Sequence, residues 1–246
     1  MNFVNRLEAR LEALELNRQP GWFRIIYLLI PLIIYYIVGD ATEIVLWALI
    51  NNMTITGDIA TFSAVIKAVI YLMGALLSLI ILKKMALNEI TYVTHKKIND
   101  ENRLKIVIFA VAASLVSAIV LNMIFYYAGW TKMSAEYERV SANQYGISLV
   151  AGVIIYGLCS PFIEEVIFRG IIYNRLKRIF PVTMSIVLSA LLFGMFHGNI
   201  VQGVYGFLMG FLITLFYERY NSFLIPVLMH MVANISIYVL SYVVWK

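Results

Sequence analysis

Seven long runs of apolar residues, separated by short polar or charged segments, dominate the chain from residue 25 onwards. Most are close to the ~20 residues, range ~17–25, that an α-helix needs to cross ~30 Å of hydrocarbon, although the first and fifth runs are short. The runs cover residues 25–38, 60–82, 106–128, 147–163, 182–196, 199–217 and 223–245. This pattern predicts an all-α, polytopic bundle of about seven transmembrane helices.

Residues 41–53 add an uncertain element between the first two runs. They are moderately apolar but carry Glu43, so they form either an eighth crossing or a re-entrant or interfacial helix. Before the first run, apolar residues recur at helical spacing among charged ones: Phe3, Leu7, Leu11 and Leu14. We therefore expect an amphipathic helix within residues 1–21, lying on the membrane surface or on the rest of the protein.

Composition supports a membrane protein and excludes several other classes. The chain is 62% hydrophobic and 13% charged, with a mean hydropathy of +0.84, against roughly 45–50% and about 25% in soluble domains. No basic face with interleaved aromatic residues suggests a nucleic-acid partner, so the expected surroundings are the lipid bilayer. The single cysteine, Cys159, cannot form an intramolecular disulfide. We expect one membrane domain, with N-terminal helices over residues 22–145 and a second half over 146–246.

The positive charges indicate how the helices are oriented. Basic residues precede the first run and crowd the segment after the second: Arg6, Arg10, Arg18 and Arg24, then Lys83, Lys84, Lys96, Lys97, Arg103 and Lys105. Because Lys and Arg collect on the cytoplasmic side, both segments are expected inside the cell. We expect a multi-pass protein of a bacterial cell membrane, with a cytoplasmic N-terminus and an external C-terminus.

Two adjacent carboxylates and an arginine follow the fourth run. Ionisable residues are costly within a membrane span and usually carry function. Glu165 and Arg169 are four residues apart, so on a helix they share a face and can form an ion pair. Glu164 is rotated by ~100° from Glu165 and is left without that partner. It could serve as a general base or acid, although these residues could also merely mark the end of a span.

Two of the three histidines lie in or beside apolar runs, whereas His95 lies in the basic loop. His197 follows Phe193 by four residues, and His230 precedes Asn234 by four, so on a helix the members of each pair share a face. A single buried histidine is usually a hydrogen-bonded core residue. Two imidazoles, a carboxamide and an unpaired carboxylate on different helices could instead converge on one water molecule.

That set of groups suits hydrolysis. Glu164 would take a proton from water, His197 and His230 would hold the water, and Asn234 with one histidine would stabilise the oxyanion. One carboxylate and two imidazoles, from Glu164, His197 and His230, also form a recognised ligand set for Zn²⁺. A zinc-dependent and a metal-free arrangement fit the spacing equally well.

These motifs resemble those of the CPBP family of CAAX proteases and bacteriocin-processing enzymes, also called Abi proteins. They are Glu-Glu-x-x-x-Arg at Glu164, Glu165 and Arg169, Phe-x-x-x-His at Phe193 and His197, and His-x-x-x-Asn at His230 and Asn234. The order of the motifs matches the family, and the resemblance covers about residues 147–239. Each motif lies in or beside an expected span.

The resemblance implies an intramembrane endopeptidase, or metallo-endopeptidase, that acts on a membrane-associated peptide of prenylated CAAX or signal/bacteriocin type. Glu164 would activate water, while His197, His230 and Asn234 would complete the site and Glu165, Arg169 and Phe193 would support it. Two other functions fit the sequence less well. One is a non-proteolytic immunity or regulatory protein of the same fold, and the other is a transporter with a proton relay.

The expected span limits do not bring the three main groups to one depth. Straight antiparallel helices with these limits leave His197 near an outer end, away from Glu164 and His230. Either the fourth span continues to about residue 177, or the fifth begins later than residue 182.

Overall fold

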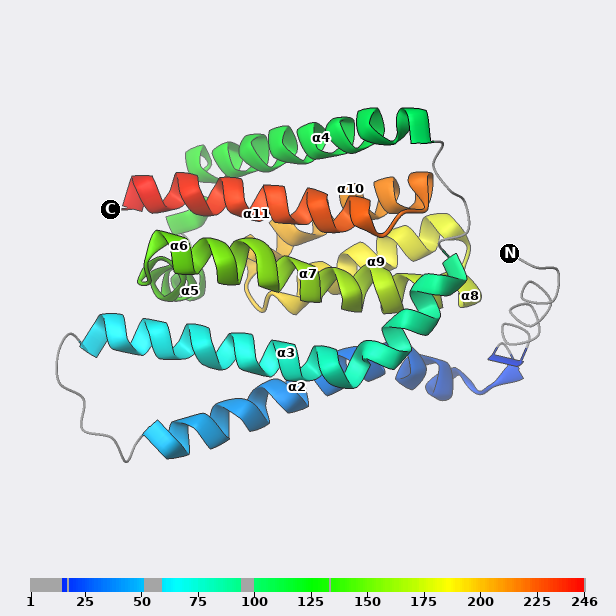
Figure 1. Cartoon of the computed structure of the whole chain (residues 1–246), viewed down its shortest axis with the longest axis horizontal. Helices are drawn as coiled ribbons and strands as arrows, with labels where there is room; N and C mark the ends of the chain where they lie inside the picture. The colour runs from blue at the N-terminus through cyan, green and yellow to red at the C-terminus, as the bar shows by residue number, and fades with distance from the viewer. Residues whose placement is uncertain (1–14, 17, 51–58, 94–99, 133, 246) are drawn as a thin grey trace.

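Each of the seven apolar runs lies in a helix in the computed structural model, which describes residues 15–16, 18–50, 59–93, 100–132 and 134–245. Within these residues the structure contains helices and no strands (Figure 1). Six separate helices are α2 (Gly21–Ile50), α3 (Ile59–Val93), α4 (Asp100–Tyr127), α9 (Val182–Phe196), α10 (Ile200–Tyr220) and α11 (Leu224–Trp245). The fourth run lies in a continuous helix, here called the central helix, made of α6 (Leu149–Gly152), η2 (Val153–Cys159), α7 (Ser160–Glu165), η3 (Val166–Tyr173) and α8 (Asn174–Ile179).

In the part of the chain that the structure describes, six helices are long and apolar enough to cross a membrane, and a seventh, α9, is an apolar helix of 15 residues. The six candidate spans are Gly21–Ile50, Phe62–Ile90, Asn102–Tyr127, Leu149–Ile179, Ile200–Tyr220 and Leu224–Val243. The predicted all-α, polytopic fold is therefore confirmed, and the chain is an integral membrane protein. Residues 41–50 continue α2 as its last turns, whereas residues 51–53 and the amphipathic segment over residues 1–14 lie outside the described residues.

Two short helices between α4 and the central helix were not predicted from the apolar pattern. They are η1 (Trp130–Lys132) and α5 (Ala135–Tyr145). Ser134 caps α5 by accepting a hydrogen bond from the amide of Tyr137, which satisfies one of the free N–H groups at the helix start. Because α5 is polar and short, it lacks the apolar run that marked the other helices.

The central helix is the interior element of the bundle. Of its most apolar window, 56% is buried inside the protein, against 17–39% for the other candidate spans. In Figure 1, α2 and α3 lie on one side of it, and α11 lies between it and α4 on the other side. The largest hydrophobic cluster surrounds its second half, with Ile167, Phe168 and Ile171 packed against residues that include Leu82 of α3 and Phe193 of α9.

The predicted end of the fourth span at residue 163 is wrong, and the alternative of a longer span is confirmed. The span runs from Leu149 to Ile179, which makes Glu164 its middle residue. Hydropathy alone ends the span at the first glutamate, because it scores Glu164, Glu165 and Arg169 as three unpaired charged residues. Glu165 and Arg169 neutralise each other inside the protein, so the helix continues.

The turn between α8 and α9 brings His197 to the depth of Glu164. Phe180 leaves the helix in an extended conformation and Pro181 begins the next one. Glu164 and His197 are equally far along the chain from this turn, on antiparallel helices, and α9 is only about 22 Å long. The helix α9 therefore begins at residue 182, where the fifth apolar run begins, and ends next to His197.

The chain breaks between α9 and α10 at this depth. Gly198 has a positive φ of 70°, which glycine adopts without steric cost. Asn199 then caps α10 by accepting a hydrogen bond from the amide of Gln202 at 2.9 Å. Gly198 itself is exposed, whereas His197 beside it is partly buried.

A buried ionic cluster fixes the N-terminal helices to the central helix. Glu89 of α3 accepts from Arg175 Nε at 3.2 Å and from Arg178 Nη2 at 2.6 Å, both near the end of the central helix. Arg175 also donates to the carbonyl of Tyr27 on α2, whose ring centroid lies 4.0 Å from the guanidinium carbon. The Tyr27 hydroxyl completes the cluster by donating to Glu89 at 3.2 Å. One carboxylate thus holds three helices together.

Replacing Glu89 by glutamine should destabilise the fold, because the buried guanidinium of Arg175 would lose the negative charge of Glu89. Removing one partner of a buried pair typically costs about 3–5 kcal/mol. We expect Glu89→Gln to lower the thermal midpoint in detergent, measured by circular dichroism, by several degrees. The matched control is Glu136→Gln, which removes the exposed Glu136–Arg139 pair and should leave the midpoint unchanged. Equal midpoints for both variants would contradict the role of this cluster.

Candidate active site

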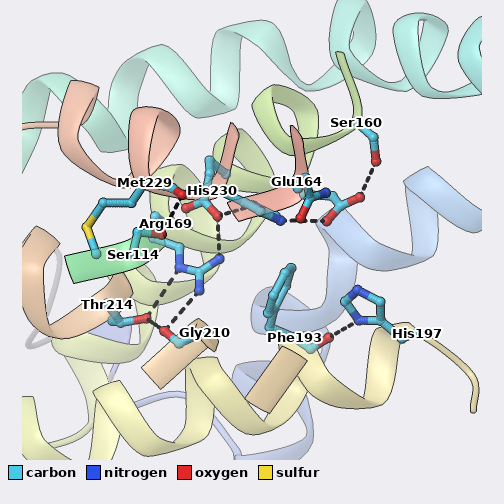
Figure 2. Close-up of polar contacts among 12 residues, drawn as sticks. Ser114, Ser160, Glu164, Arg169, Phe193, His197, Gly210, Thr214, Met229 and His230 are labelled. Atoms are coloured by element: carbon cyan, nitrogen blue, oxygen red, sulfur yellow. Dashed lines mark hydrogen bonds and ion pairs between the residues drawn. The ribbon is translucent and has the colours of Figure 1, made fainter. Parts of the chain in front are cut away.

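The predicted ion pair between Glu165 and Arg169 is confirmed, and it lies wholly inside the protein. Arg169 Nη1 is 2.7 Å from Glu165 Oε1, and both side chains are 0% exposed. The same carboxylate oxygen is 2.7 Å from Nδ1 of His230 on α11 (Figure 2). Glu165 therefore connects the central helix to α11 and fixes the orientation of the His230 ring.

Arg169 extends this network to two further helices. Its Nη2 donates to the carbonyl of Gly210 at 3.0 Å, and its Nε donates to the hydroxyl of Thr214 at 3.3 Å, both on α10. Its guanidinium carbon lies 4.6 Å from the ring centroid of Phe193 on α9. A Cβ at position 210 would lie 2.8 Å from Phe193 and 3.1 Å from Arg169, so a glycine is needed where α10 approaches.

Glu164 points away from this pair, as predicted from the helical rotation, but it has partners of its own. Ser160, one turn earlier, donates to Oε1 of Glu164. The hydroxyl of Tyr71 on α3 is 2.6 Å from the Ser160 hydroxyl and 3.4 Å from the same carboxylate oxygen. The other oxygen, Oε2, lies 3.8 Å from Nε2 of His230. Two hydroxyls therefore hold one oxygen, and the second faces the imidazole.

The imidazoles of His197 and His230 both pack against the ring of Phe193. The Phe193 ring centroid is 5.0 Å from that of His197 and 5.4 Å from that of His230, and both imidazoles are almost perpendicular to it. His197 Nδ1 is 2.9 Å from the carbonyl of Phe193, so this carbonyl orients the ring as Glu165 orients His230. Figure 2 shows His197 separated from the Glu164–His230 group, with Phe193 beside it.

Asn234 donates a hydrogen bond to a backbone carbonyl that has no donor from the following turn of its own helix. Its Nδ2 donates to the carbonyl of Tyr156 at 3.1 Å, and Tyr156 lies in the π-helix η2, just before Pro161. The amide of Ser160 donates five residues back, to Ile155. In the same pattern the backbone amide of residue 161 would donate to the carbonyl of Tyr156, but residue 161 is proline, which has no N–H. The Ser160–Pro161 step therefore leaves the Tyr156 carbonyl for Asn234.

These groups surround a cavity of about 410 Å³. Its lining includes three of the four residues predicted to be catalytic, namely Glu164, His197 and Asn234, whereas His230 is not part of the lining. The cavity extends past residues that the sequence analysis did not identify: Lys67, Tyr71, Tyr156, Ser160, Gln202 and Tyr205. Ser160 could have been found from its spacing, because it precedes Glu164 by four residues and so shares its helix face.

The described residues only partly fit a zinc ion. His197 and His230 each have Nδ1 engaged and Nε2 left for another ligand, which is the usual arrangement of metal-binding histidines. However, within the ranges that the structure describes, no three His, Cys, Asp or Glu side chains are placed to hold one metal ion. Zinc binding by Glu164, His197 and His230 therefore stays a prediction.

Comparison with known proteins links this site to proteases. Residues 146–236 match the family model "Type II CAAX prenyl endopeptidase Rce1-like". A stretch of 89 residues is 25% identical to a Bacillus subtilis (strain 168) protein named "Putative membrane peptidase YdiL", covering 36% of each chain. The matched stretch is therefore about a third of that relative's length.

The search of solved structures found no match, so the link rests on sequence and on the arrangement of the motifs. The family-model match includes Glu164, His197, His230 and Asn234 and ends before the last turns of α11. The resemblance to the CPBP family of membrane proteases that the motifs indicated is thereby confirmed over residues 146–236.

Proposed function

We propose that this protein is an intramembrane endopeptidase in which Glu164 activates a water molecule to hydrolyse a peptide bond. The observation that carries the proposal is the position of Glu164 at the middle of the central helix, where it lines a cavity together with His197 and Asn234. A carboxylate, an imidazole and a carboxamide facing one cavity provide a base and hydrogen-bonding groups for a tetrahedral intermediate.

The attacking water would bind between Glu164 and His230. The 3.8 Å between Glu164 Oε2 and His230 Nε2 is too long for a direct hydrogen bond, and contacts of this length are often bridged by water. Ser160 and Tyr71 hold the other carboxylate oxygen, which keeps Oε2 directed at the bridging position. Glu165 fixes His230 through Nδ1, so Nε2 faces the same place.

In the reaction, the oxygen of this water bonds to the carbonyl carbon of the substrate while Glu164 takes the water's proton. The tetrahedral intermediate then collapses, the carbon–nitrogen bond breaks, and Glu164 returns the proton to the leaving amine. His197 has Nδ1 bound to the Phe193 carbonyl, so its Nε2 can accept a hydrogen bond from the water or the substrate.

Asn234 would stabilise the negatively charged oxygen. A carboxamide has two N–H donors, and Asn234 uses Nδ2 to bind the Tyr156 carbonyl. The second N–H of this group can donate into the cavity that Asn234 lines. Because the Tyr156 contact fixes the amide group in advance, the donor needs little rearrangement when charge develops.

The expected substrate is a membrane-associated peptide of prenylated CAAX type or of signal or bacteriocin type. A site halfway along a membrane-spanning helix suits a peptide held in the bilayer by a lipid group or an apolar segment, and the matching family model describes prenyl endopeptidases. Zn²⁺, if bound, would polarise the substrate carbonyl or the water. Metal content measured on purified wild type and His230→Gln tests that part separately.

Replacing Glu164 by glutamine should abolish cleavage while preserving the fold, because glutamine accepts the same hydrogen bonds but cannot take a proton. General-base catalysis usually contributes about 10²–10⁴-fold, so we expect at least that loss in kcat. Purified protein in detergent would be incubated with a prenylated CAAX peptide and with a pool of membrane peptides, and products read by mass spectrometry. Glu136→Gln, on the exposed surface, is the control and should retain full activity.

Equal cleavage by Glu164→Gln and wild type would overturn the role of Glu164. Absence of cleavage by both proteins, together with stable binding of a partner, would favour the non-proteolytic regulator instead.

Asn234→Ala should lower kcat by about 10²–10³-fold, the usual loss when one oxyanion donor is removed. KM should change little, because the negative charge on oxygen develops only in the transition state. Initial rates across substrate concentrations would separate the two constants. A rise in KM with an unchanged kcat would instead show that Asn234 binds the substrate without stabilising the intermediate.

A further inference from the structure

Lys67 is a charged residue within a membrane-spanning helix, and it has no role in the proposed reaction. It lies on α3, inside the candidate span Phe62–Ile90, near the end remote from the basic residues Lys83 and Lys84. Charged residues within spans are costly and usually face a protein interior or a water-filled cavity. The Lys67 side chain is exposed, and it lines the same cavity as Glu164.

The helix itself sets the distance between Lys67 and the candidate active site. Lys67 precedes Tyr71 by four residues, so both side chains leave the same face of α3, about one turn or 6 Å apart along the axis. The Tyr71 hydroxyl lies 3.4 Å from Glu164 Oε1. The backbone of Lys67 therefore lies about one helical turn from that of Tyr71, the α3 residue that contacts the carboxylate proposed to activate water.

The ammonium group of Lys67 is directed into a polar part of the cavity. Its Nζ donates to Oδ1 of Asn143 on α5 at 3.2 Å, and Asn143 and Gln144 both line the cavity. Asn143 is neutral, and an ammonium group has three N–H donors. Lys67 can therefore bind an anionic group in the cavity while it keeps the contact to Asn143.

Charge is distributed unevenly along this cavity. Among its lining residues in the described part of the chain, Lys67 supplies the ammonium group and Glu164 the carboxylate, and they come from different helices, α3 and the central helix. An anion entering the cavity is repelled by Glu164 and attracted by Lys67. A peptide with a carboxylate at one end would therefore be oriented before its scissile bond reaches Glu164.

We propose that Lys67 binds a carboxylate of the substrate peptide, supplied either by its C-terminus or by an acidic side chain. The inference rests on the proposed peptidase function. Lys67 thus determines specificity and lies outside the segment that matches the family model.

Three peptides that differ only at the C-terminal end test the proposal. The first ends in a free carboxylate, the second in an amide, and the third in an amide with aspartate as its last residue. Dissociation constants would be measured on a Glu164→Gln background, where peptides remain intact, and KM on the cleaving protein. The variants are Lys67→Met and, as the matched control on the same helix, Lys83→Met, whose exposed side chain lies outside the cavity lining.

We expect the protein with Lys67 to bind the free-carboxylate peptide roughly tenfold more tightly than the amide, with a preference that weakens as salt increases. Lys67→Met should remove this preference by weakening only the carboxylate peptide, whereas Lys83→Met should keep it. Tight binding of the aspartate peptide would assign the site to any carboxylate at that position, and weak binding would assign it to the C-terminus.

Two results would overturn the proposal. One is the absence of any preference between carboxylate and amide peptides in binding and in cleavage. The other is an equal effect of Lys67→Met on both peptides, which would indicate a structural role or a contact with lipid headgroups. A preference in binding without cleavage of any peptide would instead disprove the peptidase function and leave the carboxylate site intact.

Discussion

The burial of Arg169 next to Glu165 is the constraint on which the rest of this structure depends. A charge at the centre of a membrane protein is tolerated only when it is paired and hydrogen-bonded, and Arg169 has partners on two elements. Glu165 also binds His230 of α11, while Arg169 lies over Phe193 of α9. Four helices are therefore placed relative to one another by one ion pair, and the spacing of the proposed active site follows from it.

Adjacent glutamates have opposite tasks because a helix rotates by about 100° per residue. Glu165 faces Arg169 and His230 and is completely buried, whereas Glu164 faces Ser160, Tyr71 and the cavity. The helix carrying them is α-helical between two π-helical segments, which are frequent at functional sites. The first segment ends at the Ser160–Pro161 step, which leaves the Tyr156 carbonyl for Asn234.

The sequence predicted the helices and the Glu165–Arg169 pair correctly, because apolar runs and four-residue spacings are local properties. It ended the fourth span at residue 163 and offered a longer span only as one of two alternatives, because charge neutralisation by Arg169 depends on tertiary packing. The depth of His197 followed only once that length was known. Tyr71 gave no signal, since tyrosine is ordinary in membrane helices. Lys67 did give a signal, because it is a charged residue inside an apolar run. The same criterion identified Glu164.

The N-terminal helices therefore do more than surround the C-terminal half. Residues 146–236 carry the groups that would perform the chemistry, but Tyr71 holds Glu164 from α3, and Lys67 lines the cavity from the same helix. The Glu89 cluster fixes α3 to the end of the central helix, so the placement of both side chains depends on that anchor. Chains that share the catalytic motifs could change substrate by changing the residue one turn from Tyr71, because this position contacts neither Glu165 nor Arg169 and can vary without disturbing their pairing.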